Sequence, residues 1–264
     1  MTIVKSQRHI SPKNPSWAPF GVATILFFAL CIWGGFGGSI AEHSLQLKWN
    51  IIGDDTFVIP AGRFILLFSM TWVIGLAMLL LLPRKLSAAK ICLLILALAL
   101  MFRLPLLAQN PSDDINRYLW EGRMLQEGIS PYHYAPDDPN LANLVKNDPF
   151  HARINHPDIP AIYTPFILSI FSLATSINYS PMIIKILAII FDMGTIGFLL
   201  MLLDHRHLDP RWSILYAFNP VILYAFAGQG HFDVIQIFFL AGAICFFDRK
   251  LWSWMFLFVG IAGT

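Results

Sequence analysis

The sequence predicts an all-α fold, a polytopic bundle of transmembrane helices with one long loop outside the membrane. Of its 264 residues, 56% are hydrophobic and 13% are charged, whereas soluble domains are roughly a quarter charged. The mean hydropathy is +0.62, and several apolar runs reach the roughly 20 residues that a helix needs to cross the ~30 Å hydrocarbon core of a bilayer. The net charge of +2 is too small to indicate a nucleic acid, so we expect membrane lipids and no nucleic acid as partners.

The apolar runs give the helices in order. Four runs meet or nearly meet the length of a span: Trp17–Ile40, Ala61–Leu82, Ile91–Ala108 and Met182–Leu203. Further apolar runs lie at Trp212–Ala227, Val234–Phe247 and Leu251–Thr264, and the run Ile162–Ile177 is marginal in length. Because the last run stops without a polar terminus, we expect the chain to be the N-terminal part of a longer protein, truncated before its later helices.

The distribution of Lys and Arg gives the orientation, because cytoplasmic loops retain these residues. Segments 1–16 and 83–90 each hold three bases and no acid, whereas segment 41–60 between them holds three acids and one base. The segment Gln109–Pro160 holds eight acids and four bases. We therefore expect a multi-pass protein of the plasma (inner) membrane with a cytoplasmic N-terminus and with Gln109–Pro160 outside the cytoplasm.

Two arrangements of the marginal run Ile162–Ile177 are open. If it crosses the membrane, the basic turns 205–211 and 249–250 lie outside. If it lies along the outer interface, both turns lie inside, and the connection that carries His231 and Asp233 lies outside. We favour the second arrangement, which places these two residues on the same face as the acidic loop.

The first part of this loop carries the residues best suited to catalysis. Ser112 or Asp113 can cap a short helix. On that helix Asp114, Arg117 and Tyr118 have the spacing i, i+3 and i+4 and share one face. A carboxylate there can take a proton from an attacking hydroxyl, and a guanidinium can hold a phosphate. The competing interpretation is that the two aspartates only cap the helix and that Arg117 pairs with one of them.

The rest of the loop is rich in Pro and Tyr, at 130–139 and again at 155–165. Prolines restrict the backbone where no regular structure holds it. Aromatic rings with polar tips suit a sugar or a lipid headgroup at the membrane interface. Taken singly, each segment is also what a well-ordered loop contains.

Two ionisable residues lie inside the run Met182–Leu203. Lys185 and Asp192 are seven residues apart and share one face of a helix, and such groups mark either a site or a buried pair. Lys185 would lie near the outer surface, within reach of a phosphate. The alternatives are that Lys185 extends to the interface and that Asp192 forms a hydrogen bond between helices. Arg103, near the end of the third run, is equally ambiguous.

Neither a disulfide nor a thiolate metal site is expected. The three cysteines, Cys31, Cys92 and Cys245, all lie inside apolar segments.

The sequence Ser112-Asp-Asp-Ile-Asn-Arg-Tyr-Leu-Trp-Glu-Gly-Arg123, followed by Gly128-Ile-Ser-Pro-Tyr-His-Tyr-Ala-Pro136, resembles the first outer loop of the GT-C glycosyltransferases. These polytopic enzymes use polyprenyl-phosphate sugars. The likeness is greatest to bacterial polyprenol-phosphate-mannose-dependent mannosyltransferases and to the enzyme that adds the first mannose of GPI anchors. It extends from about Arg103 to the end of the chain, through Tyr163-Thr164-Pro165, Lys185 with Asp192, Asn219-Pro220 and Gly230-His231-Phe232-Asp233.

The resemblance implies a GT-C-like module over residues 91–264 with its catalytic loop at 109–160, preceded at 1–90 by a cytoplasmic tail and two extra helices. In the wider superfamily an Asp that opens this loop is the proposed base. The Asp-x-x-Arg-Tyr pattern of lipid-sugar enzymes falls on Asp114, Arg117 and Tyr118. The chain has no Asp-x-Asp spacing here, so no cofactor is certain, and a divalent metal is possible but not indicated.

On this resemblance we expect a transferase that moves a hexose, most consistently mannose, from polyprenyl phosphate to a hydroxyl of a lipid or glycan acceptor outside the cytoplasm, with inversion. Asp114 is the expected general base and Asp113 its alternate. The residues expected to bind the donor phosphate are Arg117 and Lys185, with Arg123 and His156 as weaker candidates. Those expected to border the substrate pocket are Tyr118, Tyr163, His231 and Asp233.

Two other classes of protein fit part of the pattern. A flippase of lipid-linked sugars makes no bond, and the Lys185 and Asp192 pair suits it equally well, but it needs no carboxylate at the outer mouth. A structural membrane subunit would need none of these polar residues.

Overall fold

The structure is a computed structural model that describes residues 17–36, 47–48, 58–59, 62–83 and 85–263. The regular structure in these ranges is helical, apart from a two-residue antiparallel pair, β1 (Leu47–Lys48) with β2 (Val58–Ile59). The all-α prediction is therefore confirmed. The basic segment 1–16 and Arg84, used above for orientation, lie outside the described residues.

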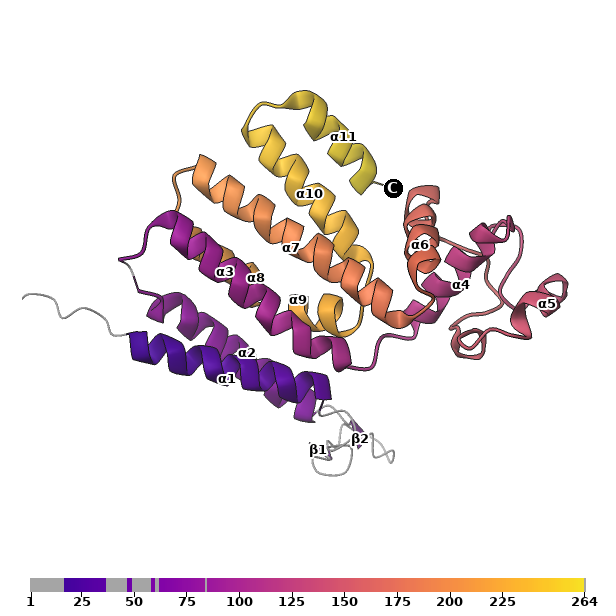
Figure 1. Cartoon of the computed structure of the whole chain (residues 1–264), viewed down its shortest axis with the longest axis horizontal. Helices are drawn as coiled ribbons and strands as arrows, with labels where there is room; N and C mark the ends of the chain where they lie inside the picture. Colours follow the sequence, from indigo (N-terminus) through magenta and orange to yellow (C-terminus); the bar gives the residue numbers. More distant parts are fainter. Residues whose placement is uncertain (1–16, 37–46, 49–57, 60–61, 84, 264) are drawn as a thin grey trace, which may run out of the picture.

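The long helices form one layered bundle, in which α3 contacts α7, α7 contacts α10, and α1 and α2 cover one side while α11 covers the other (Figure 1). They are α1 (Trp17–Phe36), α2 (Gly62–Leu81), α3 (Ala88–Arg103), α7 (Pro181–His205), α10 (Asp233–Asp248) and α11 (Trp252–Ala262). The 3-10 helix η1 (Leu104–Ala108) extends α3.

Shorter helices occupy one end of the bundle and the connection from α7 to α10. Those at the end are α4 (Asp114–Gln126), η2 (Pro139–Leu141), α5 (Ala142–Val145), η3 (His151–Arg153) and α6 (Pro165–Ile177). Those in the connection are η4 (Pro210–Ser213), α8 (Ile214–Ala217), α9 (Pro220–Ile222) and the π-helix η5 (Leu223–Gly228).

Three described helices are long and apolar enough to cross a membrane: Trp17–Gly35, Ala88–Ala108 and Pro181–His205. Three shorter helices are also apolar: Ile65–Leu81, Pro165–Ile177 and Trp252–Ala262. The protein is therefore a membrane protein, and these helices lie where the sequence places its apolar runs.

The apolar run Trp212–Ala227 does not form one continuous helix: the chain is divided there into η4, α8, α9 and η5. Pro220 has no N–H to donate, and its ring disfavours the helical conformation in Asn219 before it. Asn219 is accordingly extended, and its side chain accepts a hydrogen bond from the N–H of Val221 at 2.9 Å. The chain restarts as α9 and widens into η5, a π-helix of the kind frequently found at functional sites.

Different segments of the chain form the two ends of the bundle. At one end Arg206, which follows α7, pairs with Asp248 at 2.9 Å, and Arg211 donates to the carbonyl of Pro83 at 3.1 Å. At the other end α6 stands against α4 rather than between α3 and α7, and the turn with His231 lies beside α4 (Figure 1). The helices α4 and α6 and the turn with His231 therefore share one end of the bundle.

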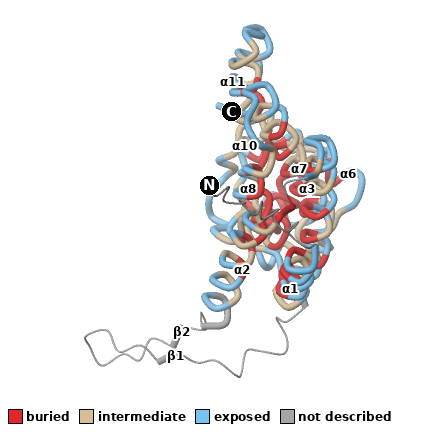
Figure 2. The backbone as a smooth tube through the Cα atoms, turned by 90° about the vertical axis from the view of Figure 1, so that its left-hand side faces the viewer, coloured by how far each residue is buried: buried red, intermediate tan, exposed pale blue. Residues whose placement is uncertain are grey.

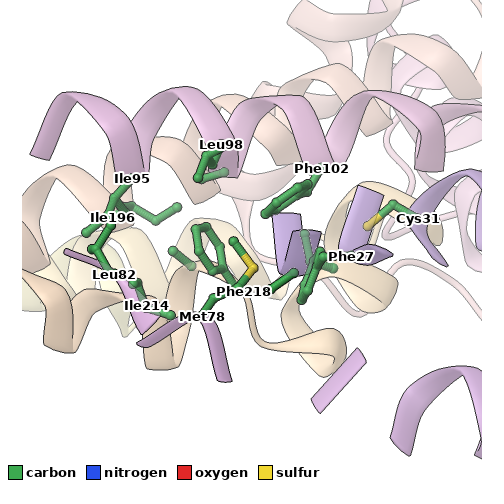
Figure 3. Packing of buried hydrophobic residues seen from close by; sticks show 14 of the residues in the cluster. Phe27, Cys31, Met78, Leu82, Ile95, Leu98, Phe102, Ile196, Ile214 and Phe218 are labelled. Carbon is green, nitrogen blue, oxygen red and sulfur yellow. The ribbon is translucent and has the colours of Figure 1, made fainter. Parts of the chain in front are cut away.

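The main hydrophobic core joins the first two helices to the later ones. Phe27 of α1 lies 4.4 Å from Phe102 of α3, and Phe102 lies 5.1 Å from Phe218 after α8, between ring centroids (Figure 3). Buried backbone concentrates in the middle of the bundle, whereas α11 is largely exposed (Figure 2). The first two helices therefore share a single core with α3, α7 and α8.

A buried ion pair crosses this core. Arg103 Nε donates to Asp192 Oδ2 at 2.6 Å, and both side chains are 0% exposed. Arg103 Nη1 also donates to the carbonyls of Ala99 and Ala217, at 2.8 and 3.0 Å. Asp192 thus pairs with Arg103 and not with Lys185, and the pair ties α3 to α7 and α8.

We expect Asp192→Ala to lower the free energy of unfolding by about 3–5 kcal/mol, because it leaves the Arg103 charge buried without its partner. The double replacement Arg103→Met with Asp192→Leu should cost less than Asp192→Ala, since it removes both charges. Unfolding in mixed detergent micelles measures both, with the exposed Asp204→Ala as the control. An equal loss in all three variants would contradict the structural role of the pair.

Candidate active site

The helix α4 begins at Asp114, after the segment 109–113 that follows η1. The hydroxyl of Ser112 accepts from the Asp114 N–H at 3.3 Å and lies 3.1 Å from Asp114 Oδ2, to which it can donate. Asp113 occupies the N-cap position, but its side chain accepts no capping hydrogen bond from the helix. Of the two predicted caps, Ser112 therefore satisfies the helix start, and the carboxylate of Asp113 is exposed.

Asp114 is a half-buried carboxylate that the protein orients. Its Oδ1 accepts from Nδ2 of Asn155 at 2.6 Å, and its Oδ2 lies 3.6 Å from Nδ1 of His231. The side chains of Asp114 and His231 are 31% and 28% exposed. A carboxylate held in this way still has a face open to a substrate, which is the geometry that a general base needs.

The imidazole of His231 is held from its other side. Its Nε2 lies 3.3 Å from Oε1 of Gln229, and Nε2 of Gln229 donates to the hydroxyl of Tyr224 at 2.9 Å. Tyr224 belongs to η5, so the π-helix and the turn after it direct this chain of polar groups toward Asp114. Gly230 makes the turn possible: its φ is +78°, and a Cβ there would lie 2.5 Å from Ile115.

Arg117 lies on α4 as predicted, but it pairs with neither aspartate. Its Nε donates to Glu121 at 2.8 Å. Its Nη1 donates to the carbonyls of Asn155 and His156, and its Nη2 to those of Ile159 and Pro160. All five N–H groups of the guanidinium are thus engaged within the protein, and a phosphate could bind Arg117 only by displacing one of these partners.

Lys185 is similarly occupied. Its ammonium donates to the carbonyls of Leu106, Leu107 and Gln109 at 2.8–2.9 Å, and the residue is 2% exposed. These carbonyls lie at and just beyond the C-terminal end of η1, where helical hydrogen bonds run out. Lys185 therefore fastens the start of the loop to α7.

The two weaker candidates for the phosphate lie elsewhere. Arg123 pairs with Asp148 at 2.7 Å, and Tyr179 donates to the same carboxylate at 2.6 Å. Nine residues of helix place Arg123 about 13 Å along α4 from Asp114. His156 is exposed and adopts a positive φ of 46°, and its carbonyl is one of the partners of Arg117.

The aromatic candidates form a packed cluster beside the site. Tyr118 is 1% exposed and stacks on Phe171, with ring centroids 4.7 Å apart. Tyr163 lies edge-on to Tyr118 and to Phe232, at 5.6 and 4.9 Å. Burial raises the pKa of both phenols, that of Tyr163 to about 12. Tyr118 is thus a buried packing residue next to the site, whereas Tyr163 is half-buried and partly accessible.

Asp233 is exposed at the first turn of α10. Next to it a small apolar pocket opens between α6, α7 and the start of α10, lined by Phe171, Ile184, Leu187, Gly230, Phe232 and Ile235, among others. Among the described residues no group of three or more His, Cys, Asp or Glu side chains could hold a metal ion.

Asn155, Gln229 and Glu121 are the residues that sequence reasoning missed. Asn155 and Gln229 lie next to motifs that the sequence did single out, but neither has a charge or a spacing that indicates a partner. Their roles become visible only when the loop 155–160 and the turn after η5 are seen beside α4.

Comparison with known proteins agrees with the sequence resemblance. Residues 20–264 match the family model described as alpha-(1->6)-mannopyranosyltransferase, N-terminal domain. No curated protein and no solved structure matches the chain. Since the match spans nearly the whole sequence, the chain belongs to the alpha-(1->6)-mannopyranosyltransferase family.

Proposed function

We propose that the protein transfers mannose from a polyprenyl phosphate to a hydroxyl of a lipid or glycan acceptor on the extracytoplasmic side of the membrane. Membership of a mannosyltransferase family supports the sugar and the reaction class. The half-buried carboxylate of Asp114, at one end of an apolar helix bundle, is the observation that carries the proposal. A lipid-linked donor would reach such a site from the bilayer while its headgroup stays at the interface.

Asp114 would act as the general base, with the adjacent Asp113 as the alternate acid. The acceptor hydroxyl oxygen attacks the anomeric carbon of mannose and its proton passes to Asp114. The bond from that carbon to the phosphate oxygen breaks, and polyprenyl phosphate leaves with the electron pair. A single displacement inverts the anomeric centre, so a β-linked donor would give an α-linked product.

The negative charge of the leaving phosphate needs a cationic neighbour. His231, whose ring lies beside Asp114 and is partly open to solvent, is our first candidate for a direct contact. Lys185 and Arg117 would contribute mainly through their fixed charge, because their N–H groups already have partners. His156 could contact a phosphate from the surface, whereas Arg123 would do so only after a rearrangement. Tyr163 and Asp233 would border the substrate pocket.

The proposed membrane side follows from charge. The end of the bundle with the site carries the acidic segment Gln109–Pro160, whereas Lys85, Arg206 and Arg249 gather at the other end. Cytoplasmic loops retain Lys and Arg, so the second end would face the cytoplasm. A GT-C-like fold, proposed from the loop motif, has this same polarity.

Asp114→Asn should lower kcat by about 10²–10⁴-fold while donor binding is retained, because the amide keeps the shape but cannot accept the proton. Transfer of labelled mannose by the protein in proteoliposomes measures the effect. Asp113→Asn is the matched control and should change kcat by less than about tenfold if Asp114 is the base. Loss confined to Asp113→Asn would reverse the two assignments.

His231→Asn should lower kcat by roughly 10–100-fold, since it replaces a ring that can carry positive charge with a neutral amide beside the leaving phosphate. The exposed His133→Asn, in the segment Gln109–Pro160, provides the control and should retain activity. Steady-state transfer rates at saturating donor make the comparison. Equal activity of His231→Asn and wild type would exclude His231 from the reaction.

A further inference from the structure

The guanidinium of Arg117 makes most of the hydrogen bonds that hold the loop segment 155–160 against α4, in addition to the bond from Asn155 to Asp114. Four of the five N–H groups of Arg117 donate to carbonyls of this segment, at 2.5–3.4 Å. The fifth donates to Glu121, one turn further along α4. The side chain of Arg117 is 6% exposed, so these bonds form in a largely desolvated place where they are strong.

Glu121 holds the Nε end of the Arg117 guanidinium. Its side chain is 1% exposed, and only one of its two carboxylate oxygens has a hydrogen-bond partner. The planar guanidinium presents its donors in a fixed fork, so holding its Nε end determines where the other four donors point. The pair with Glu121 thus directs the four Nη N–H groups of Arg117 toward the segment 155–160.

The segment needs such a fastening. His156 has a positive φ of 46°, a conformation uncommon in non-glycine residues that persists where surrounding contacts determine it. Residues 156–160 are exposed. Pro157 has one further tie, since its carbonyl accepts from the Asp137 N–H at 3.1 Å.

Asn155 connects Arg117 to Asp114, the proposed base. Its backbone carbonyl is held by Arg117, and its side-chain amide donates to Asp114 Oδ1 at 2.6 Å. The chain of contacts therefore runs from Glu121 through Arg117 and Asn155 to the proposed base.

We propose that Arg117 is a positioning residue, which holds the segment 155–160 so that the amide of Asn155 fixes the carboxylate of Asp114 toward the acceptor hydroxyl. This inference rests on the proposed function of Asp114. It replaces direct binding of the donor phosphate by Arg117 with an indirect action through the loop.

The pair with Glu121 adds a pH dependence. Burial raises the pKa of Glu121 to about 7, against the opposing charge of Arg117. Among the described residues, Tyr132 and Tyr163 also interact electrostatically with Glu121, and both phenols are neutral at this pH. As pH rises through about 7, Glu121 ionises and its hydrogen bond with Arg117 becomes an ion pair, which holds the guanidinium more firmly, so kcat should rise. Glu121→Gln should remove this rise and retain the lower kcat at every pH.

A double-mutant cycle in the reconstituted full chain tests the proposal, with Arg117→Lys, Asn155→Ala and both together. Each single variant should lower kcat by roughly 10–100-fold, because small misplacements of a reacting group are costly, while the donor Kd is unchanged. The double variant should lose little beyond the worse single one, since both act on Asp114 through one path. The exposed Arg153→Lys is the control.

A weaker donor Kd in Arg117→Lys, with losses that multiply in the double variant, would overturn the proposal and identify Arg117 as a phosphate ligand. Hydrogen exchange of the amides in 155–161 separates this test from the proposed function. Faster exchange in Arg117→Lys is expected whether or not the wild type transfers mannose. If Arg117→Lys does not fold, Glu121→Gln takes its place in the cycle, and unchanged exchange there would equally overturn the inference.

Discussion

A positive charge withdrawn from water costs several kcal/mol unless oxygen atoms surround it, and this constraint organises the polar part of the molecule. Lys185 donates its three N–H groups to carbonyls at the end of η1. Arg117 donates its five N–H groups to Glu121 and to the segment 155–160. Both cations therefore link, through hydrogen bonds, segments that are far apart in the sequence. Asp114 and His231, each about 30% exposed, are left with open faces.

The position of these open faces follows from how the bundle ends. The extension η1 stops at the carbonyls that Lys185 binds, so the chain turns away from α7 and starts α4 at Asp114. On the other side, the break at Asn219-Pro220 ends α8 and leads through η5 to the turn with His231. Two interruptions of regular helix thus bring a carboxylate and an imidazole together at the end of an otherwise apolar structure.

Sequence reasoning predicted the helices and placed Asp114, Arg117 and Tyr118 on one of them, because hydrophobic length and the spacing of these residues are local properties. It did not find the partners of Arg117 and Lys185, since backbone carbonyls leave no trace in residue identity. Of the two interpretations of Asp192, the bond between helices is the one that the structure shows, but the sequence did not identify its partner, Arg103 on α3. The run 212–227 shows a different limit: apolar composition hid the break, although Asn219-Pro220 stands in the sequence.

The Arg103 and Asp192 pair also bears on the rival function, transport of a lipid-linked sugar. An ion pair with both side chains 0% exposed serves the packing of α3, α7 and α8, which removes the main feature that favoured a flippase. The most direct measurement supplies polyprenyl-phosphate mannose with labelled sugar, together with an α-mannoside acceptor, to the reconstituted protein. Mannose transfer predicts label in the acceptor through a new α-linkage. Intact donor that crosses the bilayer while the acceptor stays unlabelled would contradict it.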